Sequence, residues 1–138
     1  MKLRNLPTRL ATGAFIAHTG WEKLHTDEQQ AKDLHGMAAG AYPFLGPVPA
    51  PTFVRALSIG ELTTGALLLA PFVSPVVAGA ALTVFSGGLV TMYLRTPTLH
   101  KPGSVWPTRQ GIAVSKDVWM LGIGLGLMAG GLGGKKAK

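Results

Sequence analysis

Four apolar stretches alternate with polar segments along this chain. They cover residues 6–24, 53–70, 75–94 and 118–134, and each approaches the roughly 20 residues with which a helix crosses a hydrocarbon layer about 30 Å thick. The third stretch is the clearest, because its twenty residues carry no charge and a chain of 138 residues is too short to bury such a helix in a soluble core. The pattern therefore predicts an all-α fold, a four-helix transmembrane bundle that forms one membrane domain over residues 1–138.

The segments between these stretches predict how the helices are joined. Residues 26–29 match a capping box in which the Thr26 side chain accepts from the Gln29 amide, so we expect a short interfacial helix in the first loop, at the membrane surface. Four prolines then prevent a continuous helix over residues 42–52. Residues 62–94 are uncharged, which predicts a tight antiparallel hairpin of the second and third helices, and residues 95–116 form a polar loop.

Composition and charge narrow the range of partners. The net charge is +7, but the basic residues gather at the ends of the apolar stretches, where Arg9 and Lys23 would snorkel at opposite ends of the first helix. Membrane lipids with anionic headgroups are therefore expected as partners, and nucleic acid is not. Because the chain has no cysteine and its four histidines lack metal-ligand spacing, we expect no disulfide, thiolate cluster or metal site.

Basic residues divide almost evenly between the two membrane faces that four helices would define. Positive charge in the loops therefore does not settle which way the bundle faces. We favour cytoplasmic termini, because acidic neighbours can pair the loop charges whereas the terminal lysines stand free.

Glu61 is the strongest candidate for a functional residue. It lies about 12 Å along its helix from Phe53, where an ionised carboxylate without a partner costs at least a few kcal/mol. Its helical neighbours include Ser58 and Thr64, so this face should point into the bundle. His18 is expected at nearly the same depth on the antiparallel first helix. Either the two side chains share a hydrogen bond or a proton, or His18 bonds a backbone carbonyl or a hydroxyl instead.

Charged and aromatic residues gather at the membrane face served by the first and third loops. The charged ones form either a mouth above Glu61 or an ordinary belt of snorkelling side chains. The tryptophans are expected to anchor the interface, and stacking of Trp21 on a quinone-like ring is the alternative. The candidate ligand pocket consists of His18, Trp21, Lys23, Arg55, Glu61, Arg95 and Asp117.

The last apolar stretch repeats glycine at a four-residue spacing, at Gly122, Gly126, Gly130 and Gly134. Glycines at this spacing leave one helix face bare, which predicts close packing against another helix. We expect this face, through Gly122, Gly126 and Gly130, to join another membrane protein subunit or a second copy of the chain. The alternative for residues 130–134 is that they form a flexible segment of low sequence complexity.

Several of these segments resemble the DoxX family of small integral membrane proteins. The chain carries R-x-x-x-G from Arg9, G-W-x-K-L from Gly20 and G-E-L-x-x-G-x-L-L-L from Gly60, with similar short segments at 36–39, 44–46 and 116–117. The resemblance covers nearly the whole chain except the longer polar segment at 95–116. It implies a four-helix protein of the bacterial inner membrane, linked in some members to thiosulfate-quinone oxidoreduction and in others to assemblies that handle oxidative stress and thiols.

Two functions follow from the residues and from the resemblance. Lys23 and Glu61 match charged positions that recur in the family, but the resemblance assigns them no chemical role. Because nothing in the sequence specifies a substrate, we favour an accessory or scaffold subunit of a bacterial membrane complex. The alternative is a membrane subunit of a quinone-linked redox system with a pocket around Glu61, in which a bound quinone or lipid is the ligand. The sequence leaves open whether any reaction is catalysed.

Overall fold

The chain folds into helices joined by turns. The computed structural model describes residues 2–109, 111–115 and 117–136, and this part of the chain contains no strand. The all-α prediction is confirmed, and each of the four apolar stretches forms one helix. The helices are α1 (Leu6–Leu24), α2 (Glu28–Ala41), α3 (Ala50–Leu69), α4 (Pro75–Arg95), the short α5 (Ile112–Ser115) and α6 (Asp117–Lys136), with 3₁₀ turns at Leu3–Asn5, Pro43–Leu45 and Pro97–Leu99.

Two of these helices, α3 and α4, are the ones in the described chain that are long and apolar enough to cross a membrane. Helix α1 has sufficient length but carries Arg9, Glu22 and Lys23, and the apolar part of α6 is shorter. The structure therefore supports a helical protein with two candidate membrane-spanning helices.

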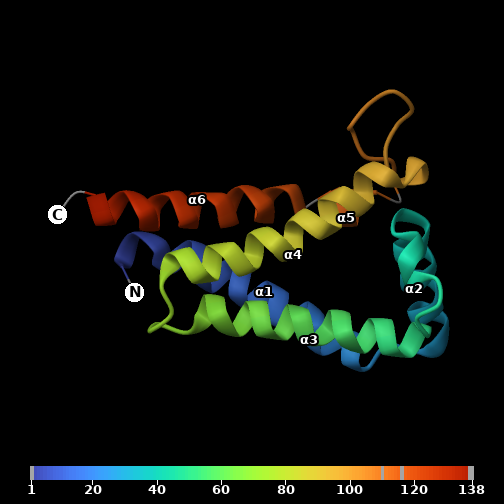
Figure 1. The fold of residues 1–138 in the computed structure, drawn as a ribbon, viewed down its shortest axis with the longest axis horizontal. Coiled ribbons are helices and arrows are strands. Elements are labelled where there is room, and N and C mark those ends of the chain that lie inside the picture. The colour runs from blue at the N-terminus through green and yellow to red at the C-terminus, as the bar shows by residue number, and fades with distance from the viewer. Residues whose placement is uncertain (1, 110, 116, 137–138) are drawn as a thin grey trace.

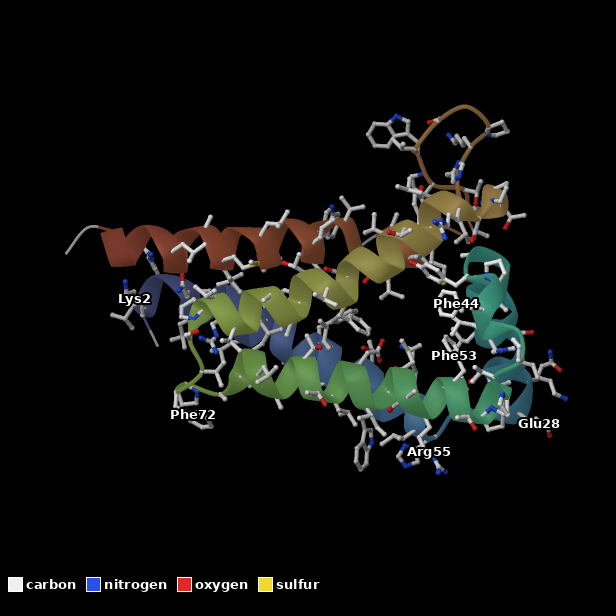
Figure 2. All side chains as sticks on the ribbon, in the orientation of Figure 1. Lys2, Glu28, Phe44, Phe53, Arg55 and Phe72 are labelled. Atoms are coloured by element: carbon white, nitrogen blue, oxygen red, sulfur yellow. The ribbon has the colours of Figure 1, made fainter. Side chains whose placement is uncertain are left out.

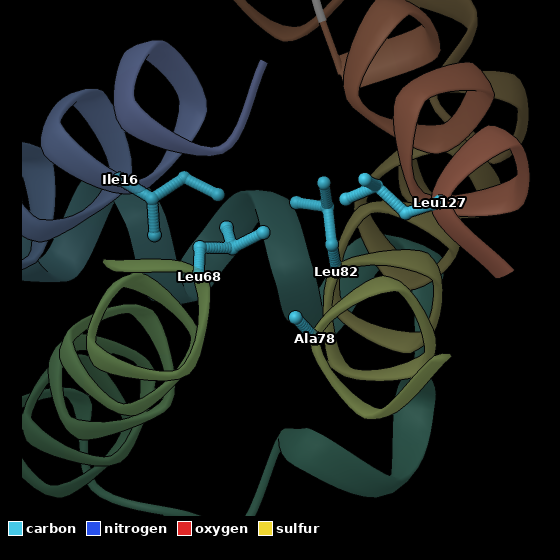
Figure 3. Close-up of a cluster of buried hydrophobic side chains, with 5 residues drawn as sticks. All are labelled: Ile16, Leu68, Ala78, Leu82 and Leu127. Atoms are coloured by element: carbon cyan, nitrogen blue, oxygen red, sulfur yellow. The ribbon is translucent and has the colours of Figure 1, made fainter. Parts of the chain in front are cut away.

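The long helices associate as two antiparallel pairs, α1 with α3 and α4 with α6 (Figure 1). The pairs meet through a small apolar cluster that consists of Ile16, Leu68, Ala78, Leu82 and Leu127 (Figure 3). Helix α1 begins and helix α6 ends at one end of the bundle, and α2 crosses the opposite end, where it contacts both α3 and α4 (Figure 1). The bundle is thus closed by the cluster on one side and by α2 on the other.

Helix α2 differs from its prediction in its cap. The cap is Asp27, whose carboxylate accepts from the amide of Gln30 at 2.8 Å, so the predicted capping by Thr26 is wrong by one residue. The inner face of α2 is buried, because Ala38 and Ala41 pack with Met92 of α4. The helix is a structural cover of the bundle.

Helices α4 and α6 approach closely at glycines that lie outside the predicted four-residue repeat. A side-chain carbon added at Gly79 would lie 2.6 Å from the carbonyl oxygen of Gly124, so only glycine allows this contact. Carbons added at Gly122 and Gly126 would meet nothing within 4 Å. Because a helix turns about 100° per residue, positions 122 and 126 share a face that α4 does not cover, while 124 faces α4. Gly134 lies in α6, and its surroundings are outside the described part of the structure.

The predicted snorkelling of Arg9 is wrong. Its side chain is fully buried and donates four hydrogen bonds of 2.8–2.9 Å to the carbonyl oxygens of Leu67, Leu68, Ala70 and Val73. These carbonyls lie at the end of α3 and in the turn to α4, where a helix leaves its last carbonyls without intrahelical partners. Residue 71 is proline, which has no amide hydrogen to offer Leu67. Arg9 supplies the missing donors and fastens α1 to the α3–α4 turn.

This role predicts that Arg9→Ala destabilises the bundle by about 3 kcal/mol, because several buried acceptors lose their donor at once. Arg9→Lys should recover part of the loss, since an ammonium donates to fewer carbonyls. The free energy of unfolding in detergent measures both. Arg4→Ala is the matched control, because Arg4 is exposed and makes one bond to the Gly130 carbonyl. Equal effects of Arg9→Ala and Arg4→Ala would contradict the assignment.

Candidate functional site

A cavity of about 450 Å³ lies between the two helix pairs and under α2. Its wall is mostly apolar, with three phenylalanines and three methionines, and all six helices contribute to it. Its volume lies in the range of pockets that bind drug-sized molecules. The lining residues are Phe15, Ile16, Thr19, Lys23, Leu34, Met37, Ala38, Phe53, Leu57, Glu61, Phe85, Leu89, Met92, Val114, Asp117 and Met120.

The main polar feature of the cavity wall is an ion pair between α1 and α3. The ammonium nitrogen of Lys23 lies 2.9 Å and 3.1 Å from the two carboxylate oxygens of Glu61. The Glu61 residue is 4% exposed, so its charge is almost completely removed from solvent. A buried carboxylate needs a partner of this kind, because desolvation without one is costly.

Close packing of α1 on α3 allows this pair to form. A side-chain carbon at Gly20 would lie 2.9 Å from the Glu61 Cβ, so the two backbones approach within reach only because residue 20 is glycine. The hydroxyl of Ser58 then donates to the Gly20 carbonyl oxygen at 2.5 Å. Ile16, Gly20 and Lys23 recur at helical spacing, which places Lys23 on the α1 face that meets α3.

Asp117, the first residue of α6, also lines the cavity. No ion pair or hydrogen bond joins its carboxylate to another described residue, and it interacts electrostatically with both Glu61 and Lys23. Together the three side chains place two carboxylates and one ammonium at the cavity. When all three are ionised, the lining carries a net charge of −1.

The cavity borders the polar surface of the molecule at Lys23. Thr19 and Lys23 also line a shallower pocket with Glu22, His25 and Gln30, outside α1. Lys23 therefore has solvent on one side and the apolar cavity on the other, and 22% of its side chain is exposed. The ion pair separates these two spaces.

His18 and Trp21, two residues predicted to line the pocket, lie elsewhere. His18 is exposed and its imidazole lies 3.3 Å from the Glu22 carboxylate, so it is not the partner of Glu61. Trp21 is 59% exposed and its ring lies against His25. The His18 side chain leaves α1 on its outer face. Lys23 lies five residues further along, about 140° around the helix, and reaches inward instead.

The two predicted arginines also lie outside the cavity. Arg55 projects from the outer side of α3 (Figure 2) and borders a surface pocket with Asp27 and Glu28. The Arg95 guanidinium donates to the Ala41 carbonyl at 3.1 Å and lies 5.5 Å from the centre of the Tyr42 ring. Arg95 thereby fastens the end of α2 to α4 and helps to hold α2 over the cavity. Of the predicted set, Lys23, Glu61 and Asp117 come together.

The apolar lining was not predicted from the sequence. Part of it carried a signal, since Phe53 and Leu57 precede Glu61 at four-residue intervals and therefore share its helix face. Figure 2 shows Phe53 beside α2, where it also meets the His35 ring. Phe15 and Thr19 precede Lys23 at the same spacing on α1, whereas Phe85 carried no such signal, because α4 is apolar on most sides. Within the described residues, no group of three or more histidine, aspartate or glutamate side chains could hold a metal ion.

The burial of the ion pair predicts an asymmetric response to substitution. Lys23→Met should destabilise the fold by about 3 kcal/mol, because Glu61 keeps its position but loses its cation. The double variant Lys23→Met/Glu61→Leu should recover most of this loss, since no buried charge is left. Lys32→Met is the control, because the Lys32–Glu28 pair is exposed and should change stability by less than about 1 kcal/mol. Unfolding in detergent measures all three, and a double variant as unstable as the single one would refute the account.

No protein-family model, curated protein or solved structure matches this chain.

Proposed function

We propose that the protein is a multi-pass protein of the bacterial inner membrane that binds a lipid-soluble small molecule inside its helix bundle, as an accessory subunit of a membrane complex. The observation that carries this proposal is the apolar cavity of about 450 Å³ whose one polar region is built from Lys23, Glu61 and Asp117. A site of this kind matches a ligand with an apolar body and a polar head.

The membrane placement rests on the exposed apolar surface of the helices. Helices α3 and α4 are long and apolar enough to cross, and large side chains such as Ile59, Val77, Val84 and Leu125 lie half or more exposed on the outside of the bundle. A soluble protein rarely leaves so much apolar surface uncovered. In our proposal α1 and α6 also cross, with Arg9 neutralised by buried carbonyls and Lys23 by Glu61. The termini then share one side, which we assign to the cytoplasm.

The topology can be tested with single cysteines, because the natural chain has none. Phe44 and Phe72 are 75% and 89% exposed and lie at opposite ends of the bundle (Figure 2). We expect a membrane-impermeant maleimide to label Phe44→Cys in intact spheroplasts, and to label Phe72→Cys only after the membrane is opened. Equal labelling of both before lysis would exclude a bundle that spans the membrane.

The quinone class is the ligand that the family resemblance suggests. A quinone has a flat apolar ring and carbonyl oxygens, which could accept from the Lys23 ammonium while the ring lies among phenylalanine and methionine side chains. The chain has no cysteine with which to hold a thiolate-bound redox centre, so electrons for such a ligand would come from a partner subunit. This chain would then bind and position the ligand.

Filling the cavity tests ligand binding directly. Leu57→Trp places a larger side chain in the lining, and we expect the purified protein to bind decylubiquinone at least about tenfold more weakly. Leu125→Trp is the matched control, because Leu125 is half exposed on α6 and distant from the lining. Quenching of ligand or protein fluorescence provides the affinities, and circular dichroism checks the helix content. If both variants bind as the parent protein does, the cavity is not the binding site.

A purely scaffolding role is the second candidate, and the outer face of α6 favours it. Gly122 and Gly126 have open space around them, and Leu125 and Leu132 are half exposed nearby. Such a face allows another helix to approach closely. Another membrane subunit or a second copy of the chain would be the partner. The two candidates are compatible, since this face and the cavity lie on different sides of α6.

A further inference from the structure

We infer that the cavity prefers a lipophilic ligand that carries one positive charge, such as an organic ammonium or phosphonium ion. This inference rests on the proposed function, because it specifies the ligand of the same cavity. Three features of the lining carry it: the count of charges, the aromatic rings and the absence of competing cations among the described residues that line the cavity.

The count of charges leaves one carboxylate without a counter-charge. Lys23 forms its ion pair with Glu61, so Asp117 has no cation of its own among the described residues. An apolar ligand that enters the cavity displaces water from this carboxylate and makes the uncompensated charge more costly. A neutral ligand would leave that cost in place or drive the carboxylate to take up a proton. A ligand with one positive charge would bring the sum of charges to zero.

The aromatic rings favour the same class of ligand. Phe15, Phe53 and Phe85 come from three different helices and all line the cavity. The face of an aromatic ring attracts a cation, and quaternary ammonium ions are commonly recognised in this way because they are poorly hydrated and cannot donate hydrogen bonds. Methionine sulfurs at Met37, Met92 and Met120 add polarizable contacts. The lining can therefore enclose a bulky organic cation without the hydrogen bonds that a small cation needs.

Among the described lining residues, Lys23 is the single basic side chain, and Glu61 holds it. Arg55 and Arg95 lie outside the cavity, and Arg95 is engaged with Ala41 and Tyr42. The imidazole of His18 is on the outer face of α1. None of these three basic side chains lines the cavity, so among the described lining residues no second cation accompanies Asp117.

A matched pair of ligands distinguishes the effect of ligand charge on binding from the effect of ligand shape. Methyltriphenylphosphonium and triphenylphosphine both carry three phenyl rings on phosphorus, but only the first is charged. We expect the full-length protein in phosphatidylcholine nanodiscs to bind the phosphonium at least about tenfold more tightly than the phosphine, by equilibrium dialysis with empty nanodiscs subtracted. Equal affinities would overturn the inference but leave the proposed function standing. If neither compound binds, and decylubiquinone does not bind either, the proposed function itself fails.

Substitutions at Asp117 then assign the preference to its carboxylate. Asp117→Asn should abolish the tenfold preference while leaving the affinity for triphenylphosphine unchanged, and Asp117→Glu should retain it. Asp33→Asn is the control, because Asp33 is an exposed acid of α2 outside the cavity. If Asp33→Asn lowers phosphonium binding as much as Asp117→Asn does, general surface attraction explains the result and the inference is wrong.

Discussion

Buried charge on α1 is the interaction on which the rest of the structure depends. Arg9 occupies one end of the contact between α1 and α3, where it satisfies four carbonyl oxygens, and Lys23 occupies the other, where it pairs with Glu61. Neither side chain can leave its place without abandoning a buried polar group, because an apolar surrounding offers no substitute partner. The two anchors therefore fix α1 against α3 both along the helix axis and in rotation.

The cavity follows from the way in which the two helix pairs meet. The α4–α6 pair is held by the close approach of Gly79 and Gly124, and the α1–α3 pair by the close approach of Gly20 and Glu61. Close packing within the pairs leaves less contact between them. A small apolar cluster joins the pairs at one end, and α2 separates and covers them at the other. The space under α2 is thus bounded by rigid contacts on each side, which suits it to hold a ligand.

Local interactions made much of this fold predictable. Each apolar stretch forms a helix within a few residues of its predicted limits, because a long and mostly apolar run is a property of the segment itself. Glu61 was expected to turn inward for the same reason, since its polar neighbours mark its helix face. The differences concern which residue makes a given contact. Asp27 caps α2 in place of Thr26, and the contact of α6 with α4 uses Gly124, which the four-residue glycine repeat did not mark.

By itself the sequence determined the helices, the turns between them and the inward direction of Glu61, because periodicity, proline and the cost of a buried charge act within short segments. Only the tertiary structure decided which side chain neutralises which. His18 and Lys23 were both within reach of Glu61 along the helix, and the rotation of α1 selected Lys23. Arg9 became a buried cap for the same reason, since the carbonyls that it satisfies belong to residues about 60 positions away. Helix rotation is set by packing over the whole bundle, and no single segment encodes it.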